Sequence, residues 1–272
     1  MTVLEFIREN TALLLKHGIQ TARLDCLVLL EDALNTNRTH LLAYPEQIIS
    51  DQQLVILTEN LRRRVQHEPL AYIRGHTEFY SRTFAVDEHV LVPRPESEAM
   101  IDLLKQYMPA QSATIIDIGT GSGALAITAK CIFPNAPVIA TDIDPACLAI
   151  AGANASKHNA AIAFFEGSLL QAVPSDVLRP RLVLLCNLPY VPNGYVINKD
   201  ATYEPPKALF AGDDGLDLYR DIFHQLDAQP ATGVFIITEA LQQQHAALTS
   251  IAQASGFQIV ASEGLAQCFA RP

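Results

Sequence analysis

The chain has 272 residues, of which 49% are hydrophobic and 18% are charged. This composition supports a substantial buried core and excludes global disorder, and the length suits one large domain or two smaller ones. The formal net charge is −10, with most of the acidic excess beyond residue 66. This charge argues against sequence-independent binding to a nucleic-acid backbone, which needs clustered Lys and Arg.

Residues 1–66 are predicted to be helical throughout. The run SDQQLVILTENLRRRV opens with Ser50 and Gln53, which have the spacing of a capping box, and apolar residues follow at positions 54, 57, 61 and 65. The basic run 62–64 is interpreted as a solvated helix end, where positive charge is favourable. The alternative for this run is contact with an acidic or phosphate-bearing partner.

The pattern changes from about Glu68. The run EFYSRTFAVDEHVLVP has short aromatic and β-branched stretches with a polar break, which predicts a hairpin or paired strands. In PRPESEAMIDLLKQYM, Pro95 is near the first turn of a predicted helix. We therefore expect a helical domain over 1–66, a hairpin linker over 67–95 and a third region over 96–272.

After Ala113 the chain alternates between strand and helix patterns. The predicted strands are ATIIDIG, PVIATDI, IAFFE, RLVLLCN, GVFIITEA and FQIVAS. The predicted helices are GALAITAKCIF, DPACLAIAGANASKH, DGLDLYRDIFHQL and LQQQHAALTSIAQAS. Such alternation indicates an α/β fold, in which a mostly parallel sheet is covered by helices on both faces.

The stretch IIDIGTGSGALAI reads as a buried strand, a glycine-rich turn and a helix. Gly119, Gly121 and Gly123 permit a tight turn and a close approach of the backbone to a ligand, and the helix start offers free N–H groups. Asp142 follows Gly119 by 23 residues at the end of the next strand, where a carboxylate can accept both hydroxyls of a ribose. Cofactor contacts are therefore expected along the turn, including Thr120 and Ser122.

Two cofactors fit the glycine turn. Gly119, Gly121 and Ala124 also satisfy the dinucleotide fingerprint, so NAD is a competitor. Asp117, however, would place a negative charge beside the pyrophosphate of NAD, whereas the ammonium group of S-adenosylmethionine would favour that carboxylate. The nearby Asp144 precedes a proline and is expected to cap the next helix rather than to contact a ligand.

The segment VLLCNLPYVPNGY ends a buried strand with Asn187. Pro189 holds Leu188 extended, so the Asn187 side-chain oxygen and the Leu188 carbonyl can accept from one NH2 group and aim it at a methyl donor. Tyr190 is expected to pack on the flat group that bears this nitrogen. The alternative is that Asn187 only terminates the strand in an Asx-turn.

Other sites have no support in the sequence. The five cysteines contain no CxxC pair and the eight histidines no HExxH spacing, so we expect no metal site and a reducing, cytoplasmic location. No apolar run approaches membrane-spanning length, and charged residues at positions 5, 8 and 9 interrupt any apolar start of the signal-peptide type. We expect no membrane partner.

The sequence resembles the family of release-factor glutamine methyltransferases (PrmC/HemK-like). The most specific stretches are PLAYIRGHTEFYSRTFAVDEHVLVPRPESE and EPPKALFAGDDGLDLYR, and NLPY at residues 187–190 corresponds to the family's NPPY motif. The resemblance implies a seven-stranded class I S-adenosylmethionine-dependent methyltransferase domain with a Rossmann-like sheet. It also implies a linking hairpin and a helical N-terminal domain that recognises class 1 peptide chain release factors.

The activity implied is methylation of the side-chain amide of the glutamine in the GGQ loop of those factors. The resemblance assigns residues 119–123, Asp142, Leu169 and Asn187 to the cofactor, and residues 187–190 to the substrate glutamine. Three departures stand out: Leu188 replaces the first proline, Ser168 stands at an expected acidic position, and the segment EGLAQCFARP lacks the usual DLxGxxR-like ending.

Alternative functions are glutamine methylation of a ribosomal protein, adenine-amine methylation of DNA or RNA, an NAD-dependent reaction, and a non-catalytic binding protein that keeps the fold. The expected partner is a class 1 release factor, without direct nucleic-acid binding, and the protein is expected to be monomeric.

Overall fold

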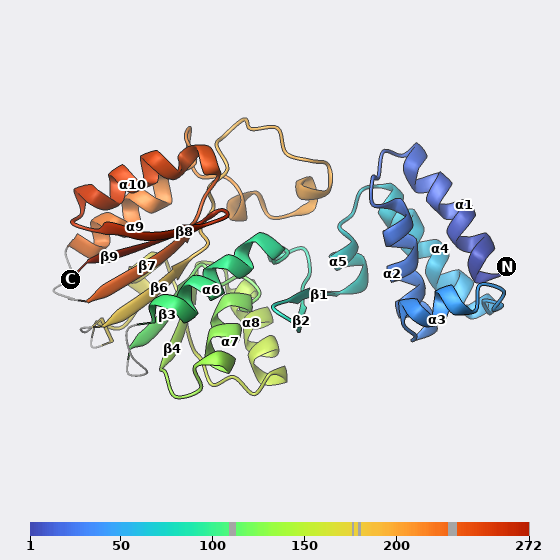
Figure 1. The fold of residues 1–272 in the computed structure, drawn as a ribbon, viewed down its shortest axis with the longest axis horizontal. Coiled ribbons are helices and arrows are strands. Elements are labelled where there is room, and N and C mark those ends of the chain that lie inside the picture. Colours follow the sequence, from blue (N-terminus) through green and yellow to red (C-terminus); the bar gives the residue numbers. More distant parts are fainter. Residues whose placement is uncertain (109–112, 176, 179–180, 228–232, 272) are drawn as a thin grey trace. The chain divides into compact units, whose positions relative to one another are not determined.

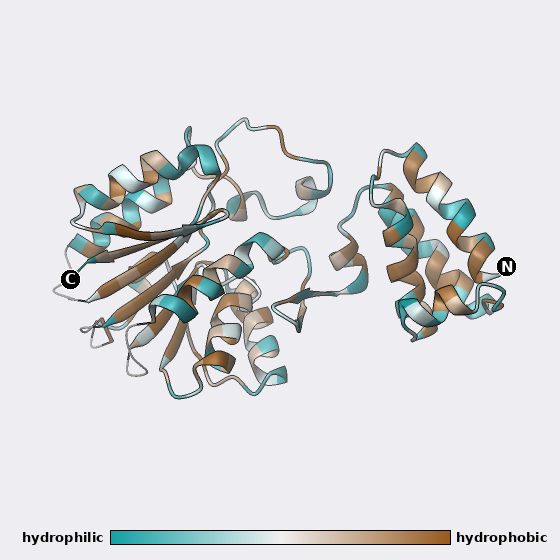
Figure 2. Cartoon of the chain, viewed as in Figure 1, coloured by the Kyte–Doolittle hydropathy of each residue, from teal (hydrophilic) through white to brown (hydrophobic). Residues whose placement is uncertain are grey.

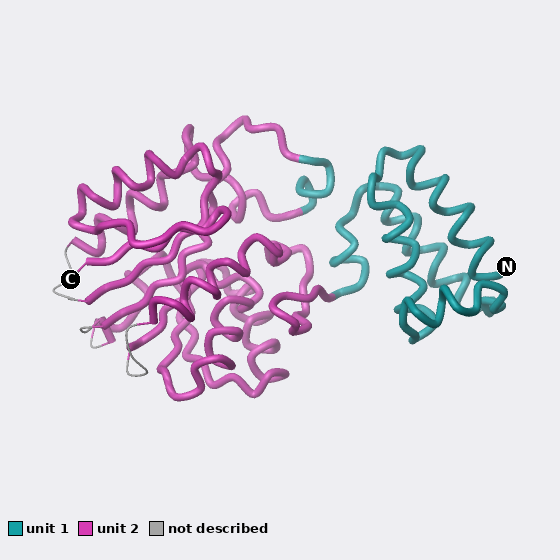
Figure 3. Tube along the Cα trace, in the orientation of Figure 1, with its two compact units in different colours: residues 1–75, 198–203 teal, residues 76–197, 204–272 magenta. Residues whose placement is uncertain are grey.

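The structure is a computed structural model, and it describes residues 1–108, 113–175, 177–178, 181–227 and 233–271 (Figure 1). It comprises two compact units (Figure 3). Residues 1–75 and 198–203 form the first, here called the helical unit, and residues 76–197 and 204–272 form the second, here called the sheet unit. The helical unit thus extends beyond residue 66 and takes in a short segment from the second half of the chain.

The helical unit consists of α1 (Val3–Lys16), α2 (Ala22–Leu34), α3 (Arg38–Ala43), α4 (Asp51–Val65) and α5 (Leu70–Arg74). The predicted capping box of α4 is confirmed, because Ser50 and Gln53 satisfy each other's backbone N–H groups. Buried aliphatic side chains from all these helices form one core. The short helix α5 was not predicted, since its few residues were assigned to the linker.

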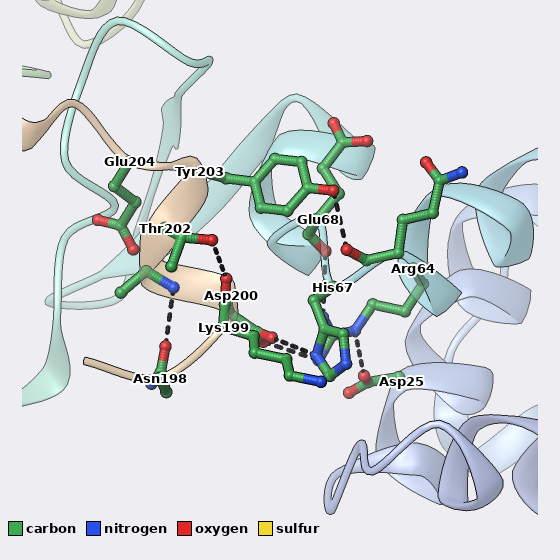
Figure 4. Close-up of polar contacts among 12 residues, drawn as sticks. Asp25, Arg64, His67, Glu68, Asn198, Lys199, Asp200, Thr202, Tyr203 and Glu204 are labelled. Carbon is green, nitrogen blue, oxygen red and sulfur yellow. Dashed lines mark hydrogen bonds and ion pairs between the residues drawn. The ribbon is translucent and has the colours of Figure 1, made fainter. Parts of the chain in front are cut away.

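One end of the predicted basic run is buried. Arg64 is only 4% exposed; its Nε lies 2.7 Å from Asp25 and its Nη2 lies 2.9 Å from Asp200 (Figure 4). Asp200 opens a 3₁₀ turn, Asp200–Tyr203, and the Tyr203 hydroxyl donates to the Gln66 carbonyl at 2.8 Å. The expectation of a solvated run is therefore wrong for Arg64, which joins residues 198–203 to α4.

The predicted hairpin is present but shorter. Strands β1 (His76–Phe79) and β2 (Arg82–Ala85) pair in antiparallel fashion around Tyr80 and Ser81, both with positive φ. That pair of left-handed residues makes a two-residue hairpin turn. The later stretch of the predicted pairing, residues 88–92, forms no strand.

The sheet has seven strands, in the order β5-β4-β3-β6-β7-β9-β8. Their bounds are Thr114–Ile118 (β3), Val138–Asp142 (β4), Ala163–Glu166 (β5), Leu182–Cys186 (β6), Val234–Glu239 (β7), Gln258–Glu263 (β8) and Ala266–Arg271 (β9). Strands β3 to β7 run parallel and β9 is antiparallel to both neighbours, so the predicted, mostly parallel sheet is confirmed. The seven strands agree with the number that the resemblance implies. The residue patterns did not locate β9, which lies in the atypical C-terminal segment, whose last residue, Pro272, is outside the described residues.

Helices cover both faces of this sheet (Figure 1). They are α6 (Glu98–Tyr107), α7 (Ala124–Ile132), α8 (Pro145–Lys157), α9 (Asp217–Asp227) and α10 (His245–Ala254). Alternate strand residues enter two cores: α9 and α10 contribute to one, and α6, α7 and α8 to the other. The strands are accordingly hydrophobic along most of their length (Figure 2). None of the helices in the described ranges is both long enough and apolar enough to cross a membrane.

Candidate active site

A pocket of about 180 Å³ lies in the sheet unit. The turns that follow β3, β4 and β6 line it, at the carboxyl edge of the sheet, where open α/β folds bind ligands. The predicted site residues that line it are Gly119, Thr120, Gly121, Ser122, Asp142, Leu169, Asn187, Leu188 and Pro189. The pocket thus brings together three separate sequence motifs.

The glycine turn leaves room for a ligand. Gly119 and Gly121 have φ values of +72° and +54°, in the region that favours glycine. A Cβ atom on Gly121 would meet nothing within 4 Å, whereas one on Gly119 would lie 3.3 Å from the Leu188 side chain. Gly123, at φ +82°, is the N-cap of α7. The open face at Gly121 fits close approach of a cofactor to the backbone.

Asp117 lies behind this turn and is not among the pocket-lining residues. It is 1% exposed, and its Oδ2 accepts from the Thr120 hydroxyl at 2.6 Å and from the Ala126 N–H at 3.1 Å. Its Oδ1 has no hydrogen-bond partner within the described residues. Burial raises the pKa of Asp117 to about 7, against the two hydrogen bonds, which lower it. The site therefore holds one buried acceptor that the protein leaves unused.

Asp142, at the end of β4, has a fixed carboxylate. Its Oδ2 accepts from the Gly121 N–H at 2.9 Å and its Oδ1 from the Asp144 N–H at 3.0 Å. Each oxygen keeps a further lone pair for a ligand hydroxyl. The cap predicted for Asp144 is confirmed, since its side chain accepts from the Ala146 N–H at 2.9 Å. It also pairs with Lys207.

Asn187 follows β6, and its side-chain NH2 donates to the Ser97 hydroxyl at 2.9 Å. Leu188 is 3% exposed and packs in the core that includes α9 and α10. The Tyr190 hydroxyl donates to Glu239 Oε1 at 2.9 Å, and Tyr190 does not line the pocket. In this structure the tyrosine therefore contacts the end of β7, while Asn187 through Pro189 border the pocket.

Sequence reasoning missed several lining residues: Phe79, His89, Leu91, Pro93, Ser97, Cys147, Lys207, Ala208 and Leu218. Most come from the segment treated as a linker or from EPPKALF. Both stretches had been noted as family-specific, which was a signal of function, but periodicity alone does not show that a loop faces a pocket.

The fold has known structural neighbours. The chain superposes on a crystal structure of the hMettl16 catalytic domain in complex with MAT2A 3′UTR hairpin 1, with a TM-score of 0.53 and 15% identity over 82% of this chain and 80% of that one. A methyltransferase from Pyrococcus furiosus gives a TM-score of 0.52 and 14% identity, with 82% and 97% covered. With this sheet order, the fold is that of the class I S-adenosylmethionine-dependent methyltransferases.

Sequence comparison is more specific. The PrmC N-terminal domain family matches residues 5–75, and the ribosomal protein L11 methyltransferase (PrmA) family matches residues 96–188. Proteins named release factor glutamine methyltransferase from Coxiella burnetii and Staphylococcus aureus are 35% and 34% identical to this chain. The matches cover 88% and 91% of this chain, and 86% and 88% of those proteins.

A protein of the same name from Moorella thermoacetica is 34% identical, with 94% of this chain and 91% of that protein covered. The chain therefore belongs to the release factor glutamine methyltransferase family. Membership favours S-adenosylmethionine over NAD as the cofactor of the glycine turn.

Proposed function

We propose that this protein transfers a methyl group from S-adenosylmethionine to the side-chain amide nitrogen of the glutamine in the GGQ motif of class 1 peptide chain release factors. The observation that carries the proposal is the single pocket in which the glycine turn, Asp142 and the start of NLPY meet. The choice of substrate follows the names of the relatives, which are release factor glutamine methyltransferases.

The residues present fit the cofactor. The open face at Gly121 suits contact with the ligand, Asp142 suits a ribose, and Leu169 suits the flank of an adenine. The unpartnered oxygen of Asp117 is an acceptor suited to an ammonium group. When bound, the cofactor supplies an electrophilic methyl group on a positively charged sulfur.

The substrate nitrogen is a weak nucleophile, because its lone pair is delocalised into the amide carbonyl. We assign two acceptors to this NH2 group, the Asn187 Oδ1 and the Leu188 carbonyl oxygen. They orient the nitrogen and stabilise the positive charge that develops on it as the new N–C bond forms. The proton becomes acidic only after attack, so no strong general base is required. Pro189 keeps the backbone at Leu188 extended, which fixes the direction of its carbonyl group.

Release-factor recognition is assigned to the helical unit, because the family match at residues 5–75 covers it. This match favours a release factor over a ribosomal protein as substrate. We further propose that the enzyme acts as a monomer in the cytoplasm, without contacting nucleic acid directly.

The test is a substrate panel. The protein is incubated with methyl-labelled S-adenosylmethionine and, separately, with a class 1 release factor, with ribosomal protein and with DNA or RNA. We expect label on one glutamine of the release factor, located by peptide mapping. Label found only on a ribosomal protein or on adenine would contradict the proposed function and identify that molecule as the substrate.

A further inference from the structure

Ser97 is the only residue of the 3₁₀ turn Pro95–Ser97 that the pocket reaches among the described residues, and it is 3% exposed. Its hydroxyl accepts a hydrogen bond from the side-chain NH2 of Asn187 at 2.9 Å. The turn belongs to PRPESE, one of the family-specific stretches for which the proposed chemistry has no role. Ser97 therefore contacts a proposed catalytic side chain from outside the NLPY motif.

Glu239, the last residue of β7, contacts the other end of the NLPY motif. It is 1% exposed, and its Oε1 accepts from the Tyr190 hydroxyl at 2.9 Å. Its Oε2 has no close hydrogen-bond partner, and no ion pair of the described residues includes Glu239. Burial raises the pKa of Glu239, while the nearby Ser97, Tyr190 and Asn187 side chains lower it. Burying a carboxylate without a cation costs folding free energy. Such groups are found most often at functional sites.

The printed geometry gives the direction of the hydrogen bond between Ser97 and Asn187. The Asn187 amide presents its NH2 group to the Ser97 oxygen, which accepts from it at 2.9 Å. An amide side chain has one donor end and one acceptor end. This leaves Asn187 Oδ1 as the free end of the amide.

We propose that Ser97 is a positioning residue that holds the Asn187 amide with its oxygen available to the substrate. This inference rests on the proposed function and deepens it. The opposite orientation would set the Asn187 NH2 against the NH2 of the substrate glutamine, two donors that cannot bond. Glu239 accepts from the Tyr190 hydroxyl, so the last residue of the NLPY motif is also held by a hydrogen bond.

The first test compares Ser97→Ala and Ser97→Thr in the full-length protein, with Ser250→Ala as the matched control. Ser250 is an exposed serine whose hydroxyl donates to the Ala246 carbonyl of its own helix. We expect kcat on release factor to fall about 10- to 100-fold in Ser97→Ala. A loss of this size is typical when a residue that orients a functional side chain is removed. Affinity for S-adenosylmethionine should stay within about twofold, which also shows that the variant is folded.

Ser97→Thr keeps the hydroxyl and should retain most of the turnover. Full kcat in Ser97→Ala, or equal losses in the Ala and Thr variants, would each overturn the proposal.

A second measurement does not depend on the substrate. Hydrogen exchange of the Asn187 side-chain NH2, followed by NMR, should be protected in the wild type and in Ser97→Thr and faster in Ser97→Ala. Equal exchange in all three would overturn the positioning role. Inactivity of the wild type on release factor, with exchange as expected, would instead reject the proposed substrate and leave the orientation of Asn187 supported.

Discussion

At the scale of single residues, the departure at Leu188 has a structural explanation. Its N–H makes no backbone hydrogen bond within the described residues, and its side chain fills the space beside Gly119, which has no side chain. Leucine thus replaces the ring of proline with packing against the glycine turn. The proposed chemistry needs only its carbonyl, which any residue provides.

Leu188→Pro should therefore leave turnover within about twofold, because Pro189 already restricts residue 188 to extended backbone. Stability should fall by roughly 1 kcal/mol, since about one buried methylene is lost and the gain from a stiffer unfolded chain is smaller. Methylation assays and urea unfolding test the two parts. An inactive wild type that gained activity on this substitution would mean that leucine misplaces the carbonyl.

Asp117 predicts a pH dependence of cofactor binding. Its pKa is raised to about 7 by burial, so the carboxyl is largely uncharged at pH 6 and largely ionised at pH 7.5. A cationic ligand favours the ionised form, so affinity for S-adenosylmethionine should rise about five- to tenfold between these values. Calorimetry on the wild type and on Asp117→Asn is the measurement, and the variant should show a flat profile. A flat profile in the wild type would remove Asp117 from cofactor binding.

At the scale of elements, periodicity and turn chemistry were sufficient for most of the fold. The capping box at Ser50 located the start of α4, and the apolar runs located the five parallel strands, because strands buried on both faces are continuously hydrophobic. Periodicity missed β9, whose short segment follows a tight turn at Gly264. The same approach located the glycine turn, Asp142 and Asn187, but not Ser97 or Glu239, whose roles depend on contacts distant in sequence.

The buried end of α4 gives a stability prediction. Arg64→Met should cost about 3–5 kcal/mol of unfolding free energy, because Asp25 would stay buried without its cation. Arg62→Met is the matched control: Arg62 is an exposed arginine of the same helix that pairs with Glu59, and its loss should cost less than about 1 kcal/mol. Denaturant unfolding of both full-length variants is the measurement, and similar costs would show that the Arg64 pair is not stabilising.

At the scale of the whole molecule, the chain enters the helical unit twice. Residues 198–203 come soon after the NLPY motif in the chain. Asp200 pairs with Arg64 (Figure 4), and Tyr203 bonds the Gln66 carbonyl. All residues that line the candidate active site belong to the sheet unit. Binding of the cofactor and recognition of the release factor are thus assigned to different units, although the chain passes between them three times, after residues 75, 197 and 203.

A variant that lacks residues 1–67 should therefore bind S-adenosylmethionine with nearly normal affinity and lose most methylation of intact release factor. Residues 198–203 would lose their contacts with α4, so circular dichroism and thermal unfolding must first show that the sheet unit is folded. Undiminished methylation by the folded variant would show that the helical unit does not recognise the substrate.

In the proposed reaction, Asn187 accepts a hydrogen bond from the reacting amide as the methyl group transfers. The most direct measurement is the single-turnover rate of methylation of the release-factor GGQ glutamine by the wild type and by Asn187→Ala, with cofactor affinity measured in parallel. Loss of one such acceptor should slow the chemical step about 100- to 1,000-fold, with a much smaller loss of cofactor affinity. A normal single-turnover rate in Asn187→Ala would contradict the account and leave Asn187 as the residue that ends β6.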